Sequence, residues 1–105
     1  MAIRLIYELD VPPGCLREVQ ALFSERYLPA ASARGMSFAG AHITPPIELD
    51  DAPTTLVVAF ELADENAVWA MKRVATAFPG VAEFWIDIDR IVVARWRRFL
   101  APTEM

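Results

Sequence analysis

The chain has 105 residues, of which 55% are hydrophobic and 23% are charged, and its net charge is −4. This length suits one domain, 1–105, and no stretch has the composition of a linker or a repeat. An acidic chain repels nucleic acid unless its basic residues gather in one patch. The only cluster, Arg95, Arg97 and Arg98, is divided between the two faces of a strand, so we expect no binding to nucleic acid.

The same composition indicates the compartment. No uncharged apolar run approaches the ~20 residues of a membrane span, and Met1 leads directly into a charged strand pattern rather than into a signal peptide. The single cysteine, Cys15, excludes an internal disulfide and suits a reducing environment. The sequence therefore predicts a cytoplasmic protein without a membrane partner.

In the first half of the chain the hydrophobic period changes from strand to helix and back. Residues 3–9 alternate between apolar and polar, as in a half-buried strand. Residues 15–34 predict an amphipathic helix with a kink near Pro29, which lacks a backbone N–H. Residues 36–44 predict a second strand. Its alternation assigns one face to Met36, Phe38, Gly40, His42 and Thr44.

The second half repeats this order. An acidic, proline-containing connection, 45–53, leads to a nearly continuous apolar strand over 55–62, interrupted by Glu61. Asp64 is a good N-cap for a helix over 65–78. Trp69 lies almost opposite the apolar stripe of that helix, so we expect it to contact a partner subunit or residues 80–89. Pro79 and Gly80 end that helix, one or two further turns follow, and a last strand is expected over about 89–100.

The resulting order, strand-helix-strand-strand-helix-strand, is that of the ferredoxin-like or split βαβ unit. The fold class expected is therefore α+β, with a four-stranded antiparallel sheet and helices on one face only. The strand over 55–62 is apolar on both sides, so the face without helices needs a cover. A second copy of the chain is the simplest cover, which predicts a homodimer.

Several features together resemble the dimeric α+β barrel superfamily, and within it the NIPSNAP-like and antibiotic-biosynthesis-monooxygenase-like proteins. These are the element order, Gly35 and Gly40 around the second strand, the acidic connection, and the closing run from Phe84 to Arg95. The resemblance implies two sheets closed face to face and a ligand cleft between the sheet and the helices of each subunit. It also implies a cofactor-free monooxygenase-like or isomerase-like enzyme, or a protein without activity. The chain has no diagnostic catalytic motif.

His42 is the only histidine and hence the candidate catalytic residue, since histidine titrates near neutral pH. One interpretation makes it a general base or a haem ligand that points into the cleft beside Phe38. The other makes it a structural residue at a sheet edge. Beyond Arg95, nothing identifies a site for haem propionates, and a zinc site would lack a second histidine or cysteine. We therefore expect neither metal nor cofactor.

The candidate substrate-binding residues are Tyr7, Phe38, Glu61, Trp85 and Arg95. The tryptophans and tyrosines either line an aromatic pocket for a small aromatic or polyketide-like molecule or fill the core. Arg95 is expected to form an ion pair with Asp87 or to anchor an anionic substrate. Glu61 either contacts substrate or is a solvated carboxylate near the end of its strand.

Two functions stay open at this point. The first is a small-molecule enzyme that uses His42 and aromatic side chains in a pocket. The second is a non-catalytic binding or assembly module whose apolar faces serve self-association. Polar groups that converge with His42 in a cavity would favour the enzyme. A cleft filled by Phe38, Phe60 and Trp85 would favour the module.

Overall fold

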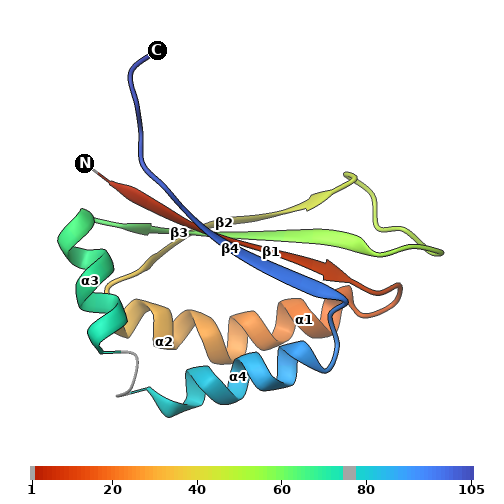
Figure 1. Cartoon of the computed structure of the whole chain (residues 1–105). Helices are drawn as coiled ribbons and strands as arrows, with labels where there is room; N and C mark the ends of the chain where they lie inside the picture. Colours follow the sequence, from red (N-terminus) through yellow and green to blue (C-terminus); the bar gives the residue numbers. More distant parts are fainter. Residues whose placement is uncertain (1, 75–77) are drawn as a thin grey trace.

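A computed structural model describes residues 2–74 and 78–105. The four strands form one antiparallel sheet in the order β2-β3-β1-β4, and all the labelled helices lie on one side of it (Figure 1). The predicted ferredoxin-like order is confirmed. The elements are β1 (Ile3–Val11), α1 (Leu16–Leu22), the π-helix η1 (Phe23–Tyr27), α2 (Leu28–Ala33), β2 (Ser37–Thr44), β3 (Thr54–Leu62), α3 (Glu65–Arg73), α4 (Pro79–Asp89) and β4 (Ala94–Leu100).

The first helical segment is continuous from α1 through η1 to α2. The predicted effect of Pro29 occurs one turn earlier, as the π-helical turn η1, in which the Leu28 N–H bonds the Phe23 carbonyl five residues before it. Proline has no N–H to donate, and its ring crowds the preceding turn. A widened turn accommodates both constraints while the apolar stripe stays against the sheet, because Val19, Phe23 and Tyr27 are all buried.

The second helical segment differs from the sequence prediction. A helix over 65–78 is wrong in extent, because α3 ends at Arg73 and α4 begins at Pro79, while Ala75 of the predicted stripe lies outside the described residues. Pro79 occupies the first turn of α4, where its missing N–H costs nothing. The helix then continues to Asp89 since Phe84 and Ile88 face the core, so β4 starts at Ala94 rather than near 89.

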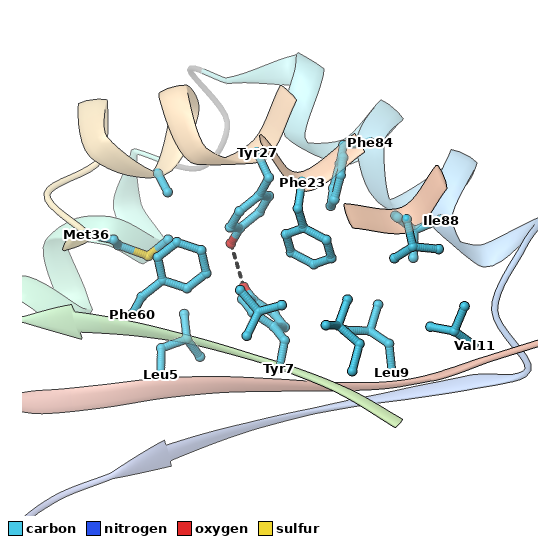
Figure 2. Packing of buried hydrophobic residues seen from close by; sticks show 14 of the residues in the cluster. Leu5, Tyr7, Leu9, Val11, Phe23, Tyr27, Met36, Phe60, Phe84 and Ile88 are labelled. Atoms are coloured by element: carbon cyan, nitrogen blue, oxygen red, sulfur yellow. Dashed lines mark hydrogen bonds between the residues drawn. The ribbon is translucent and has the colours of Figure 1, made fainter. Parts of the chain in front are cut away.

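The core between the sheet and the helices contains a cluster of aromatic rings among aliphatic side chains (Figure 2). Each ring lies within 6.2 Å of another, centroid to centroid, mostly edge to face. At its centre the hydroxyls of Tyr7 and Tyr27 share a buried hydrogen bond of 2.7 Å. The members are Tyr7, Phe23, Tyr27, Phe60, Phe84 and Trp85.

An irregularity in β2 decides which way its side chains point. Phe38 pairs with Phe60 of β3, but Gly40 pairs with Ala59, so one extra residue is inserted between them. The shift reverses the alternation after that point. Phe38 therefore shares the helix-covered face with Phe60, whereas His42, opposite Val57, is on the other face. The prediction of a single face for Phe38 and His42 is wrong because of this bulge.

The sheet face without helices, which we call the open face, carries both apolar and charged side chains. Ile6 and Ala59 on the two central strands are the least exposed of its side chains. Trp96 and Leu100 of the edge strand β4 are exposed on it, 52% and 43% respectively. Glu8 and Arg98 form an ion pair across β1 and β4 on the same face.

Candidate functional site

A hollow of about 220 Å³ lies between the helices and the β2 side of the sheet. One wall comes from α1, η1 and the start of α2, and the other from β2 and β3. Because β2 is an edge strand, the hollow opens to solvent beside Phe38, whose side chain is 51% exposed. Its lining residues are Gln20, Phe23, Ser24, Leu28, Phe38, Ala41, Leu56 and Val58.

The lining is mostly apolar. Gln20 and Ser24 are its only polar side chains, and none of the lining residues is titratable. Such a surface can hold an apolar molecule and orient it through one or two hydrogen bonds. It supplies no side-chain acid or base of its own.

His42 does not line this hollow. It lies on the exposed part of the open face, and its ring is beside Gly40, where a Cβ atom would be 3.7 Å from the imidazole Cε1. Glu61 also lies on the open face, opposite Arg4, and is solvent-exposed. The prediction that His42 points into the cleft beside Phe38 is therefore wrong. A catalytic role for His42 stays a prediction.

Three of the other predicted site residues come together elsewhere. Tyr7 and Trp85 lie 4.8 Å apart, centroid to centroid, inside the aromatic core. The Arg95 guanidinium covers the Trp85 ring at 4.4 Å from its centroid. This cluster fills the middle of the space between sheet and helices, so Tyr7 and Trp85 pack the core rather than line an aromatic pocket. Of the predicted binding residues, only Phe38 lines the hollow.

The ion pairs around α4 also differ from the prediction. Arg95 binds Asp89, with 2.6 Å between Nε and Oδ1, and not Asp87. Asp87 instead accepts a hydrogen bond of 2.6 Å from Arg26. The hydrogen bond from Arg95 holds the pKa of Asp89 below its usual value. Arg95 is thus engaged with Trp85 and Asp89, which leaves it poorly placed to anchor a substrate in the hollow.

One polar cluster surrounds the buried hydroxyl of Tyr27. Burial raises the pKa of Tyr27 far above its ordinary value, and the neighbouring Tyr7 raises it further, while Arg34 lowers it. Arg34 reaches this region from the end of α2, yet its Nε and Nη1 atoms are buried without a hydrogen-bond partner among the described residues. Buried N–H groups without an acceptor cost stability. The cluster therefore contains both a satisfied pair and an unsatisfied donor.

Trp69, predicted to contact a partner or residues 80–89, is 53% exposed. It borders a second, shallower apolar hollow beside the end of β4, together with Val68, Phe99 and Leu100. The Lys72 amino group lies over its ring at 5.1 Å from the centroid. Contact with a second subunit stays a prediction.

The described residues contain neither a cluster of metal ligands nor a membrane-spanning helix. No group of three or more histidine, cysteine, aspartate or glutamate side chains is placed to hold a metal ion within 2–74 and 78–105. In the same ranges, none of the helices has the length and apolar character needed to cross a membrane.

Gln20 and Ser24 are the residues that sequence reasoning missed. They lie four positions apart, beside the apolar stripe of the first helical segment, where polar side chains usually face solvent. Nothing in their sequence context separates them from the other exposed residues of that helical segment. The alternation of β2 also gave no hint of the bulge beyond the glycine at position 40, which has a φ of +121°.

The fold is shared with solved structures. A NIPSNAP family protein from Agrobacterium tumefaciens superimposes with a TM-score of 0.74 at 13% identity, over 99% of this chain and 95% of that one. An uncharacterized NIPSNAP domain protein from Burkholderia xenovorans gives a TM-score of 0.74 at 16% identity, over 98% and 95% of the two chains. This chain shares the fold of these two proteins. The predicted resemblance is confirmed at the level of fold.

This chain also shares its fold with an enzyme whose activity is stated. SnoaB, a cofactor-independent oxygenase from Streptomyces nogalater, superimposes with a TM-score of 0.63 at 16% identity, over 99% of this chain and 95% of that one. No protein-family model matches the sequence. No curated protein matches it at a significant level. At such identities the likeness shows a common fold, and activity has to be argued from the site.

Proposed function

We propose that this chain binds a small, largely apolar molecule in the hollow between β2 and the first helical segment. The observation that carries the proposal is the lining itself, six apolar and two polar side chains around about 220 Å³. Binding sites for small molecules have this composition, a concave apolar surface with a few polar groups that fix orientation. Phe60 and Trp85 fill the centre of the core, whereas the hollow at the β2 edge leaves space for a ligand.

The functional unit proposed is a homodimer joined through the open faces. Trp96 and Leu100 leave a large apolar area in water when the chain is alone, and its burial would stabilise an assembly by roughly 25 cal/mol per Å² of apolar surface. A two-fold contact uses the same surface on both copies, so the apolar residues of one open face would cover those of the other. His42 would then lie in or beside the subunit contact, not at the ligand.

Catalysis is the second candidate function. The observation that favours it is the full-length structural likeness to SnoaB, a cofactor-independent oxygenase. In that case the hollow would bind the substrate, and its chemistry would proceed without a titratable side chain in the lining. If the chain turns over no substrate, it would instead be a non-catalytic binding or assembly module.

Amide NMR during a titration with β-naphthol tests the binding proposal. We expect saturable shifts at Gln20, Ser24 and Ala41, which surround the hollow. Ala41→Phe should abolish them because the added ring occupies the hollow, whereas the matched neighbour His42→Ala should retain them. Shifts that do not saturate, or that follow the open face around His42, would overturn the proposal.

A further inference from the structure

The polar part of the hollow is confined to one place. Gln20 and Ser24 are four residues apart on consecutive helical segments, and this spacing puts their side chains on one helix face. The opposing wall from β2 and β3 contributes only apolar side chains, Phe38, Ala41, Leu56 and Val58. The hollow therefore has a polar edge on the helix and an apolar floor on the sheet.

Both polar side chains are available. No hydrogen bond joins the amide of Gln20 or the hydroxyl of Ser24 to another side chain or backbone group of the described residues. An amide and a hydroxyl can each donate and accept a hydrogen bond. A ligand hydroxyl or carbonyl at this edge could therefore be satisfied in either direction.

The backbone beside Ser24 adds a second polar feature. Pro29 has no N–H and donates no backbone hydrogen bond. In α-helical geometry the carbonyl left without that bond would be that of Glu25, and in π-helical geometry that of Ser24. Widened turns of this kind are frequent at functional sites. Here η1 adjoins the polar edge, since Ser24 belongs to both and Phe23 of η1 also lines the hollow.

Charge and size restrict what fits. No carboxylate, ammonium or guanidinium lines the hollow, so a charged ligand group would lose water without gaining an ionic partner. A dry cavity of about 150 Å³ holds benzene. The hollow of about 220 Å³ is larger by roughly half, which suits two fused rings.

We infer that Gln20 and Ser24 determine specificity, and that they select an uncharged, bicyclic-sized aromatic molecule with one hydroxyl or carbonyl at its edge. The inference rests on the proposed binding function and goes beyond it by naming the selecting residues and the ligand class. The rings would pack between Phe23 and Phe38, and the polar group would face the helix.

Four probes of equal ring size test it: naphthalene, β-naphthol, β-naphthoate and β-naphthylmethylammonium. Their dissociation constants would be measured by NMR titration with the full chain at neutral pH. We expect β-naphthol to bind about five- to tenfold more tightly than naphthalene, the effect of one net hydrogen bond. Both charged probes should bind more weakly than naphthalene.

The double variant Gln20→Leu/Ser24→Ala should bind naphthalene as the unmodified chain does and lose the preference for β-naphthol. Arg17→Leu, on the exposed face of the same helix, is the matched control and should keep the preference. If naphthalene fails to bind saturably, the proposed function itself fails. If naphthalene binds but the preference survives in the double variant, or a charged probe equals β-naphthol, the specificity inference alone is overturned.

Discussion

The hydrogen bond between Tyr7 and Tyr27 gives the most quantitative prediction. The two hydroxyls lie 2.7 Å apart and the two residues are only 4% and 1% exposed. Tyr27→Phe leaves the Tyr7 hydroxyl buried without this partner, which costs roughly 1–3 kcal/mol of the free energy of unfolding. Tyr7→Phe should cost less, because Tyr27 would still have Arg34 beside it.

The double variant Tyr7→Phe/Tyr27→Phe removes both polar groups while keeping both rings. Replacing two partners by apolar groups of the same shape can be nearly neutral, so the double change should cost at least ~1 kcal/mol less than the sum of the single changes. Urea unfolding followed by circular dichroism, at one protein concentration, measures all four proteins. Additive effects would refute the claim that the two hydroxyls depend on one another.

Three further predictions follow from the same structure. The pKa of Tyr27 is raised in the folded chain, so as pH rises the unfolded chain loses this proton first. The free energy of unfolding should therefore fall above about pH 10, and less steeply in Tyr27→Phe. Equal slopes of this free energy against pH in the two proteins would contradict the prediction. Arg34→Met should lower the free energy of unfolding by about 1 kcal/mol, because it removes the guanidinium beside the Tyr27 hydroxyl, while Arg17→Met should not; an increase in stability would show that the two unpartnered N–H groups of Arg34 outweigh that contact. Light scattering should give a mass of about twice 11.7 kDa. Val57→Lys on the open face should lower this mass, whereas Ile47→Lys in an exposed loop should not. A monomer at micromolar concentration would refute the dimer.

The fold was predictable because each element carries its own period. The alternation over 3–9 and the apolar stripe through Val19, Phe23 and Tyr27 are local properties, and the structure confirms the elements that they predict. The limits of α4 were not predictable from the break at Pro79, since the packing of Phe84 and Ile88 against distant strands extends that helix.

The candidate site was less predictable because it depends on a single inserted residue. The bulge before Gly40 moves His42 to the open face, and strict alternation has no way to signal it. Gln20 and Ser24 stay exposed in the structure, and only the position of β2 opposite them shows that they border the hollow. His42, Glu61 and Arg95 were predicted as site residues because their side chains can titrate or carry charge. The hollow, in contrast, is lined by residues that have no titratable side chain.

A crystal structure of the chain grown with β-naphthol tests the central claim most directly. The account predicts the rings between Phe23 and Phe38 with the hydroxyl within hydrogen-bond distance of Gln20 or Ser24, and the open faces of two copies against each other. Rings stacked on the open face beside His42, with the hollow closed by its own side chains, would contradict it.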